Sequence, residues 1–372
     1  MKAVGFYNHL PIEDSQSLID LDIQRPEYPI GRDLLVSIKA ISVNPLDTKI
    51  RRGAIPPTKN ENVPRILGWD AAGEVIATGS ECTLFEKGDT VYYAGSISRP
   101  GTNCEFHLVD ERIVGRKPKS LSFEEAAAMP LTTITAWESL YDRLSLYSDT
   151  IKKISQSITS KSNISDKRNS LSSILIIGGA GGVGSIAIQL AKNLANNLPF
   201  SSSSSSEINV IVTASRSESV EWCKKMGADF VIDHKKDLRS QVQELVGVEY
   251  VDHILCLNDT DGHFDNMKQL IAPQGKICSI VETKAPVNMG GILRQKSATF
   301  VWEVMFTRSL FQTADMIEQH NLLNTVADLI EKKKIKTTLT NLLSPINAEN
   351  LRIAHKNLES GATIGKIVLS GF

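Results

Sequence analysis

The glycine-rich run at residues 179–184 carries the strongest chemical signal in the chain. Gly179, Gly181 and Gly184 fit the spacing G-x-G-x-x-G, which lets a loop approach a pyrophosphate while the amides of the next helix hold its negative charge. An apolar run of strand length precedes the motif and an amphipathic run follows it, as this chemistry requires. A tight glycine turn that only permits close packing is the alternative. We predict a dinucleotide site at Gly179, Gly181, Gly182, Val183 and Gly184.

The type of dinucleotide depends on the end of the next predicted strand, in the sequence VIVTASRSES. An acidic residue there would accept a hydrogen bond from the 2′-hydroxyl of NAD, whereas a cation would hold the 2′-phosphate of NADP. Ser215 and Arg216 stand at this place, and the first acidic residue, Glu218, comes only afterwards. The pattern favours NADP, bound by Ser215 and Arg216, over NAD with a solvated arginine.

The hydrophobic pattern changes between the first third of the chain and its middle. Apolar alternation at 34–43, 71–79 and 89–95, separated by Pro and Gly turns, is typical of a barrel-like antiparallel domain. From residue 173, short apolar runs alternate with helical stretches, which predicts an α/β fold with a doubly wound parallel sheet. A helix over 347–362 and a closing strand after it are expected to pack back onto the N-terminal domain.

Two polar stretches, 151–173 and 196–207, interrupt this rhythm. The first is rich in Ser, Lys and Asn, and the second contains a run of six serines. Both would lengthen connections that usually have only about 2–6 residues. We interpret them as surface insertions; a regulatory or phosphorylated linker is the alternative.

The composition excludes several classes of protein. The 372 residues include 41 Lys and Arg against 42 Asp and Glu, which argues against nucleic acid as a partner. No apolar run approaches the ~20 residues of a membrane span, and the first residues lack the apolar stretch of a signal peptide. Five scattered cysteines make a poor disulfide framework. We expect a cytoplasmic protein that acts on small molecules.

Seven stretches distributed over the chain resemble the medium-chain dehydrogenase/reductase superfamily, and within it the zinc-free quinone oxidoreductase branch. The resemblance implies a GroES-like β-barrel catalytic domain, made of residues 1–129 and 301–372, around a Rossmann domain at 130–300. It also implies an active site between the domains, a nicotinamide cofactor and a homodimer. The matching stretches are AISVNPLDTKIRRG, ILGWDAAGEV, FEKGDTVYYAG, EEAAAMPLTTITAWESL, the glycine loop, MGADFVIDHK and GATIGKIVL.

Zinc-dependent members of this superfamily hold the metal with Cys, His and a further Cys or acid. The segment similar to the first ligand reads SVNPLD, without Cys, and the segment similar to the His reads Gly68-Trp69-Asp70. Cys104 and His107 have a chelating spacing, but no second pair accompanies them, and packing positions on a strand explain them better. We predict no metal site. The name "zinc-type alcohol dehydrogenase-like", used in this superfamily, is not evidence of metal.

Candidate catalytic residues follow from the resemblance. Asn44 would donate to the substrate oxygen, and Asp47 would orient Lys49 or a water, unless both only build a turn. Trp69 would form a wall for a planar acceptor or fill the space of the absent metal. Tyr92, or its neighbour Tyr93 on the opposite face of the strand, would supply a phenolic proton, and the sequence is compatible with either residue.

Further cofactor contacts are also carried over from the resemblance. Thr133, with Thr132 beside it, lies in the segment that passes beneath the nicotinamide. His234 would lie near the adenosine phosphate. Asn258, Ile280 and Val281 follow predicted strands, where backbone groups would hold the nicotinamide.

These residues predict an NADPH-dependent oxidoreductase that transfers hydride to a quinone or an α,β-unsaturated carbonyl without metal. Conjugated acceptors need less stabilisation of developing negative charge than simple ketones. A zinc-dependent alcohol dehydrogenase and a non-catalytic NADPH-binding sensor remain as alternatives.

Overall fold

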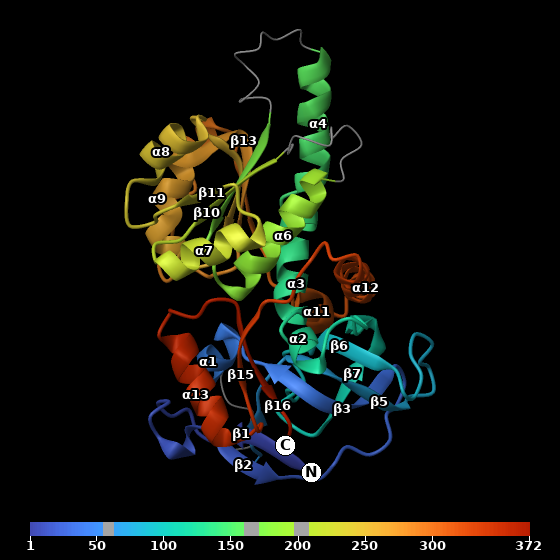
Figure 1. Cartoon of the computed structure of the whole chain (residues 1–372). Coiled ribbons are helices and arrows are strands. Elements are labelled where there is room, and N and C mark those ends of the chain that lie inside the picture. The colour runs from blue at the N-terminus through green and yellow to red at the C-terminus, as the bar shows by residue number, and fades with distance from the viewer. Residues whose placement is uncertain (55–62, 160–170, 197–207) are drawn as a thin grey trace. The chain divides into compact units, whose positions relative to one another are not determined.

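The computed structural model describes residues 1–54, 63–159, 171–196 and 208–372 (Figure 1). They form two compact units. The first, here called the β-rich unit, contains Met1–Ile134 and Met305–Phe372, and the second, the parallel-sheet unit, contains Thr135–Val304. Among these residues, none of the helices combines the length and the apolar character of a membrane span.

Antiparallel pairing dominates the β-rich unit. Its larger sheet has seven strands in the order β15-β16-β3-β5-β6-β8, with β7 paired to β3, and its smaller sheet has the order β2-β1-β4. Register shifts between β3 and β5 mark bulges, which bend strands and favour a curved sheet. The strands are β1 (Lys2–Phe6), β2 (Ile19–Asp22), β3 (Asp33–Ser42), β4 (Arg65–Ile66), β5 (Asp70–Thr78), β6 (Thr90–Ala94), β7 (Phe106–Asp110), β8 (Val114–Arg116), β15 (Leu339–Leu343) and β16 (Lys366–Ser370).

The C-terminal strand β16 completes this sheet, as the sequence predicts. It pairs antiparallel with β3, with Val368 opposite Ser42. The predicted helix before it is α13, whose first turn is capped because the Asn347 side chain accepts a hydrogen bond from the Asn350 amide. The helices of this unit are α1 (Pro45–Arg51), α2 (Phe123–Ala127), α3 (Pro130–Trp137, which continues past the unit boundary), α11 (Thr307–Phe311), α12 (Glu318–Glu331) and α13 (Ala348–Glu359), with 3-10 turns η1 (Ser15–Ser17) and η2 (Glu111–Ile113).

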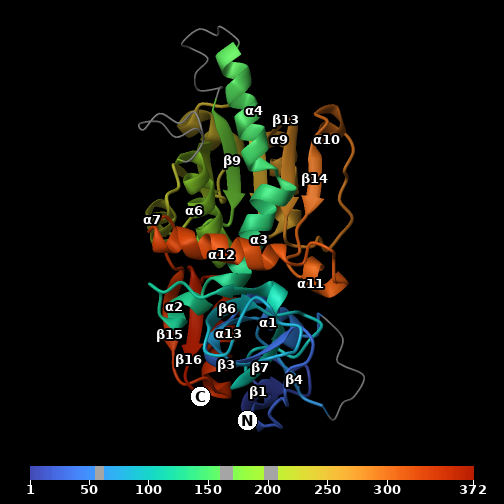
Figure 2. The same cartoon turned by 90° about the vertical axis from the view of Figure 1, so that its right-hand side faces the viewer.

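The parallel-sheet unit confirms the predicted doubly wound sheet. Its six strands pair in parallel in the order β11-β10-β9-β12-β13-β14, so the order reverses beside the first strand, where ligands bind at the carboxyl ends. Figure 2 shows β14 at one edge of this sheet. The strands are β9 (Ser172–Ile177), β10 (Ile208–Thr213), β11 (Phe230–Ile232), β12 (Val251–Cys256), β13 (Ile271–Ser279) and β14 (Thr299–Trp302).

Helices connect these strands. The α7 helix ends at Gly227 in the left-handed conformation, with φ of 109°, where a side chain would be strained. The helices are α4 (Leu146–Thr159), α6 (Gly182–Asn196), α7 (Ser217–Met226), α8 (Leu238–Gln241), α9 (Thr260–Leu270) and α10 (Ile292–Gln295), with π-helical turns η3 (Glu138–Arg143) and η5 (Val242–Val246).

The polar stretch 151–173 is not an insertion throughout its length. Residues up to Thr159 continue α4, and Ser172 already begins β9. Lys153 explains part of this order, because its ammonium bonds both carboxylate oxygens of Asp252, which also accepts from the Ser173 amide. Residues 160–170 lie outside the described residues. So do residues 197–207 of the second stretch, in which Asn196 ends α6.

Candidate functional site

The glycine loop lies between the end of β9 and the start of α6. A Cβ atom on Gly184 would meet the carbonyl oxygens of Gly178 and Gly179 at 2.5 and 2.6 Å, and one on Gly179 would meet the Val212 side chain at 2.8 Å. These two glycines are therefore required by close packing. A Cβ on Gly181 would meet only the Gly178 carbonyl oxygen, at 3.8 Å. Packing does not require glycine at this position, whereas close approach of a ligand to the backbone would.

Side chains behind the loop hold it in place. The Gly178 amide donates to the Thr213 hydroxyl at 3.0 Å, at the end of β10. The Ser185 hydroxyl donates to the Gly181 carbonyl and accepts from the Trp222 indole, both at 2.7 Å. The first turn of α6, which begins at Gly182 and includes Val183, thus presents its amides in a fixed loop. The sequence motif did not indicate that these side chains stabilise the loop. Thr213 and Trp222 belong to other elements, and Ser185 follows the last glycine of the motif.

Ser215 and Arg216 follow β10 at the carboxyl edge of the sheet. Ser215 is half-buried, and the exposed Arg216 is the N-cap residue directly before α7. The neighbouring Glu218 has its pKa lowered by hydrogen bonds from its own backbone and from Ser217, and further by Arg216. The predicted pair therefore lies at the strand end where an adenosine ribose is held in sheets of this order.

His234, the predicted phosphate contact, is exposed just after β11, the neighbour of β10. Its ring packs edge-on against that of His263, with centroids 6.5 Å apart. Burial lowers the pKa of His263; Asp259 raises it and His234 lowers it further. The structure brings His234 to the same edge of the sheet as Arg216.

Asn258, Ile280 and Val281 follow β12 and β13 at this edge. The Asn258 side chain lies beside the loop, since a Cβ on Gly178 would be 3.2 Å from its Oδ1 atom. The Val281 backbone, a predicted contact of the nicotinamide, also has partners within the protein. Its carbonyl accepts from the Thr260 hydroxyl at 2.5 Å, and its amide donates to the Ser279 hydroxyl at 3.4 Å. The Ile280 amide donates to the Cys256 carbonyl at 3.2 Å, so these bonds position the strand end.

A buried polar network joins three elements of the β-rich unit. Lys366, on β16, donates to the Asp70 carboxylate at 3.0 Å, to the Val43 carbonyl at 2.8 Å and to the Asn44 side-chain oxygen. The Asn44 amide nitrogen donates to the same Asp70 oxygen, Oδ2, at 2.9 Å, and more weakly to the Ser42 carbonyl at 3.5 Å. Asp70 Oδ1 accepts from the Leu131 amide at 2.7 Å, in the first turn of α3.

This network changes the interpretation of Asn44. The sequence predicts that it donates to a substrate oxygen, but its side chain is 2% exposed and both ends of its amide are already engaged within the protein. Lys366 was missed as a site residue, although it lies in the matching segment GATIGKIVL. A lysine before an apolar strand is expected to be solvated, and only the fold places it in the interior.

Asp47 is fully buried and does not orient Lys49. Its carboxylate accepts from the Asn44 amide at 2.6 Å and from the Gly68 amide at 2.9 Å, so it links the start of α1 to the turn before β5. Burial raises its pKa to about 7, although these amides and Lys366 favour the charged form. These contacts are typical of a residue that builds the turn at the start of α1, which was the second interpretation of Asp47.

Trp69 and Tyr92 are buried within the β-rich unit. The Trp69 indole donates to the Ser96 carbonyl at 3.2 Å and its ring packs edge-on against Phe306. The Tyr92 hydroxyl donates to the Leu323 carbonyl at 2.6 Å, and burial raises its pKa far above the ordinary value. The structure does not bring Tyr92 into the network of Asn44 and Asp70.

Thr133 differs from these residues because its hydroxyl has no hydrogen-bond partner among the described residues. The side chain is completely buried on α3, and no described residue hydrogen-bonds its hydroxyl. A buried hydroxyl without a partner costs about 1–3 kcal/mol, and a ligand that bonds it would recover this energy. The residue therefore fits the predicted contact with a nicotinamide carboxamide or ribose.

The donor atoms of the described residues do not fit a zinc ion. Within these residues, no group of three or more His, Cys, Asp and Glu side chains has the arrangement to hold a metal. The Cys104 thiol donates to backbone carbonyls, and the His107 ring bonds the Tyr93 hydroxyl and the Pro100 carbonyl, both at 3.0 Å. Asp70, next to Trp69, already faces the Lys366 ammonium, which occupies the place of a cation beside that carboxylate.

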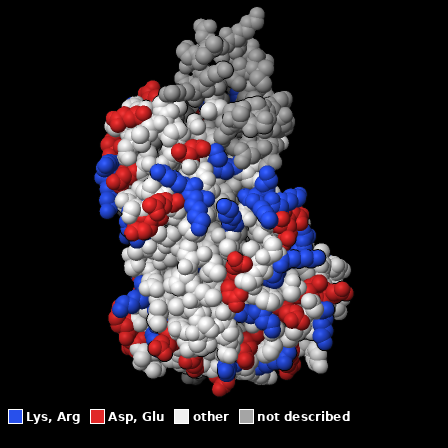
Figure 3. Space-filling model, viewed as in Figure 1, with Lys and Arg blue, Asp and Glu red and all other residues white. Residues whose placement is uncertain are grey.

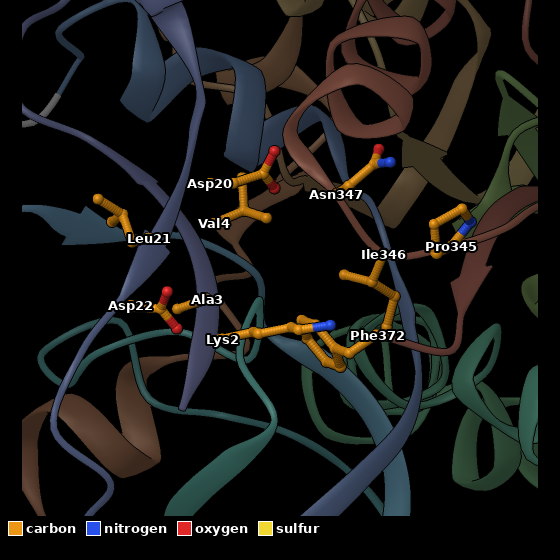
Figure 4. Close-up of a pocket in the computed structure, with 10 residues that line it drawn as sticks. All are labelled: Lys2, Ala3, Val4, Asp20, Leu21, Asp22, Pro345, Ile346, Asn347 and Phe372. Atoms are coloured by element: carbon orange, nitrogen blue, oxygen red, sulfur yellow. The ribbon is translucent and has the colours of Figure 1, made fainter.

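One hollow in the described residues lies apart from these groups. It has a volume of about 300 Å³ and lies in the β-rich unit beside β1 and β2 (Figure 4). On the face of the molecule drawn in Figure 3, acidic and basic side chains of the described residues alternate without a large patch of one sign. Ten residues line the hollow: Lys2, Ala3, Val4, Asp20, Leu21, Asp22, Pro345, Ile346, Asn347 and Phe372.

Comparisons with known proteins identify the family of the chain. Residues 31–132 match the alcohol dehydrogenase GroES-like domain, which confirms the predicted fold class, and residues 226–369 match the zinc-binding dehydrogenase family. The chain is 40% identical over 370 residues to a zinc-type alcohol dehydrogenase-like protein of Staphylococcus aureus, with 100% of both chains covered.

Solved structures share the whole fold. A candidate zinc-dependent alcohol dehydrogenase from Rhizobium etli has a TM-score of 0.85 and 47% identity, covering 100% of this chain and 98% of that one. The quinone oxidoreductase of Escherichia coli, solved in complex with NADPH, has a TM-score of 0.75 and 25% identity, covering 100% of both chains.

Proposed function

Because the chain belongs to the medium-chain dehydrogenase/reductase superfamily of oxidoreductases, we propose that it is an NADPH-dependent reductase of quinones or α,β-unsaturated carbonyl compounds that works without metal. The observation that carries the proposal is the division of roles within the glycine loop. Gly179 and Gly184 are required by packing, whereas Gly181 has open space where a pyrophosphate would approach. A turn used only for packing would not need a glycine at position 181.

The preference for NADPH is supported by the end of β10. Arg216 supplies a guanidinium and Ser215 a hydroxyl at the strand end where the two dinucleotides differ. His234 is exposed on the neighbouring strand end. The relative from Escherichia coli that was solved with NADPH has the same fold, which supports a nicotinamide cofactor.

The bound cofactor would supply hydride, and the residues of this chain would orient it and its acceptor. Thr133 offers a buried hydroxyl to the nicotinamide. The network of Asp70, Lys366 and Asn44 holds the turn before α1 and the first turn of α3 in a fixed relation. Such fixed positioning lowers the entropy that is lost when reactants meet.

A conjugated acceptor suits these residues better than a simple ketone. The Asp70 carboxylate, beside Trp69, forms an ion pair with Lys366. Among the described residues, no group of three or more His, Cys, Asp and Glu side chains could hold a metal ion as Lewis acid. Hydride addition to an enone or a quinone delocalises negative charge onto oxygen, so hydrogen bonds suffice where a ketone would need stronger stabilisation. With the Tyr92 hydroxyl bonded to Leu323, we assign the final proton to water.

The proposal also includes the organisation of the chain. Residues 1–129 and 301–372 would form the catalytic domain, and residues 130–300 the Rossmann domain. A cytoplasmic homodimer is proposed from the family resemblance. Trp302, which ends the edge strand β14 and is 43% exposed, stands where a second subunit would pack.

Oxidation of NADPH tests the proposal. Purified protein is mixed with 1,4-quinones, enones, saturated ketones or alcohols, with and without a chelator, and absorbance of the reduced nicotinamide is followed. We expect turnover with quinones or enones that resists chelation. Loss of activity in chelator, restored by zinc, would establish the zinc-dependent alcohol dehydrogenase instead. Tight NADPH binding without any turnover would favour a non-catalytic sensor.

A further inference from the structure

Two buried hydroxyl groups join the ends of β12 and β13 in the parallel-sheet unit. Thr260 is the first residue of α9, the helix that follows β12, and Ser279 is the last residue of β13; both residues are 0% exposed. Their hydroxyl oxygens lie 2.7 Å apart. The Thr260 hydroxyl also donates to the Val281 carbonyl at 2.5 Å. A side chain of the helix thus holds the backbone that follows the neighbouring strand.

The direction of each hydrogen bond in this pair follows from its partners. A carbonyl oxygen can only accept, so the contact between Thr260 and Val281 uses the single hydroxyl hydrogen of Thr260. The contact between the two hydroxyls must then use the hydrogen of Ser279, which donates to the Thr260 oxygen. The Ser279 oxygen accepts from the Val281 amide at 3.4 Å. The two side chains form a hydrogen-bonded chain that ends at the Val281 carbonyl, and bonds in such a chain polarise one another.

The backbone before Thr260 has an unusual conformation. Asp259 has φ of 42° and ψ of 63°, in the left-handed region that few residues other than glycine adopt. Its carboxylate accepts from the Gly262 amide at 3.1 Å, which caps α9 and secures the turn. This turn places Thr260 against the end of β13, two residues after Asn258, whose side chain lies beside the glycine loop. Backbone strain of this kind is common at ligand sites.

The Val281 carbonyl can accept a second hydrogen bond. A carbonyl oxygen has two lone pairs, and the Thr260 hydroxyl uses one of them. Val281 is half-buried, so its backbone is not sealed in the interior. The remaining lone pair suits an amide N–H donor, and the carboxamide group of a nicotinamide supplies such a donor.

We propose that Thr260 and Ser279 are positioning residues for the nicotinamide. Ser279 orients the Thr260 hydroxyl, and Thr260 holds the Val281 carbonyl in the direction from which it accepts a hydrogen bond of the carboxamide. Neither hydroxyl contacts the reacting atoms. Their effect is confined to the nicotinamide end of the cofactor, because the adenosine end is assigned to the end of β10. This role rests on the proposed function, which places a nicotinamide beside Val281.

The test compares two ligands by isothermal titration calorimetry. NADPH carries the nicotinamide, whereas 2′,5′-ADP carries only the adenosine and the 2′-phosphate. Thr260→Val keeps the shape of the side chain but removes the hydroxyl. We expect it to raise the dissociation constant for NADPH about tenfold, as the loss of one hydrogen bond does, and to leave that for 2′,5′-ADP within about twofold. Thr260→Ser retains the hydroxyl and should bind NADPH within about threefold of the wild type.

Thr150→Val is the matched control. Thr150 is also a completely buried threonine of the parallel-sheet unit, but its hydroxyl has no hydrogen-bond partner among the described residues, so both dissociation constants should stay unchanged. Ser279→Ala gives a second test should Thr260→Val fold poorly. Thr260 then keeps its bond to Val281 but loses the donor that orients it. The dissociation constant for NADPH should rise about threefold, and that for 2′,5′-ADP should not change.

Three results would overturn the positioning role. The first is equal weakening of both ligands in Thr260→Val and Ser279→Ala, which would indicate general damage to the fold. The second is wild-type affinity for NADPH in Thr260→Val. The third is a loss of NADPH affinity that Thr260→Ser shares in full. A wild-type protein that binds neither ligand would refute the proposed function instead, whereas one that binds both keeps it whatever the variants do.

Discussion

Lys366 Nζ lies 3.0 Å from Asp70 Oδ2 in the interior of the β-rich unit, although 296 residues separate the two in the chain. Their side chains are 4% and 0% exposed. The other two ammonium hydrogens have acceptors in Val43 and Asn44, so the buried cation is fully hydrogen-bonded. This ion pair connects the C-terminal strand to the start of α1 and, through Asp70 and Leu131, to the start of α3.

Removal of the ammonium should strongly destabilise the protein. In Lys366→Met the Asp70 carboxylate stays buried without its partner, which costs about 3–5 kcal/mol. Urea unfolding measures the loss. The double variant K366M/D70N has no uncompensated charge, so it should be more stable than K366M alone. Strictly additive effects of the two substitutions would contradict the ion pair.

Substitutions at two glycines of the loop should have different effects, one on stability and the other on NADPH binding. Gly184→Ala should destabilise the protein, because its Cβ would lie 2.5 Å from a backbone carbonyl oxygen. Gly181→Ala should leave stability within about 1 kcal/mol but weaken NADPH binding about tenfold or more, since the methyl group fills the space of the pyrophosphate. Thermal unfolding and NADPH titration distinguish the two. Unchanged NADPH affinity in Gly181→Ala would remove the loop from the binding site.

Arg216 should determine the choice of cofactor. A hydrogen bond to a charged group contributes about 1.5–3 kcal/mol, so Arg216→Ala should raise KM for NADPH about tenfold to a hundredfold and leave KM for NADH almost unchanged. Steady-state kinetics with both cofactors measures this ratio. Lys224→Ala, which removes a positive charge from the same helix, is the matched control. Equal losses with both cofactors would argue against a 2′-phosphate contact.

Asp47 should contribute to the pH dependence of stability. Its pKa is raised from 3.8 to about 7, so the folded state holds the proton more tightly, and stability falls as pH rises through this window. Asp47→Asn loses one of the two backbone hydrogen bonds and should be less stable at pH 5, with a smaller decrease towards pH 8. Urea unfolding at both values checks this, with the exposed Glu13→Gln as control. A slope equal to that of the wild type would show that Asp47 does not titrate in this range.

Tyr92→Phe should distinguish a structural hydroxyl from a proton donor. The substitution removes the hydrogen bond to the Leu323 carbonyl, which lowers stability by about 1 kcal/mol. Turnover of quinones should stay within about twofold of the wild type, because water supplies the proton. A large decrease in kcat at unchanged KM would assign the proton to Tyr92 after all.

Local patterns along the chain were enough to predict several parts of this fold. The parallel sheet follows from apolar runs that alternate with helical stretches, and the glycine loop follows from a spacing whose strand and helix are adjacent in the chain. The helix over 347–362 was predicted because capping depends on neighbouring residues, as the bond between Asn347 and Asn350 shows.

The partners of the polar side chains could not be predicted in this way. Asn44 and Tyr92 carry groups that suit catalysis, and in the fold the Asn44 amide bonds the buried Asp70 while the Tyr92 hydroxyl bonds the Leu323 carbonyl. The partner lies 231 residues away in the chain for Tyr92 and 296 residues away for Lys366. Burial and hydrogen bonding depend on contacts between segments that are distant in the chain. Local residue spacing does not predict these contacts, because the segments meet only in the folded protein.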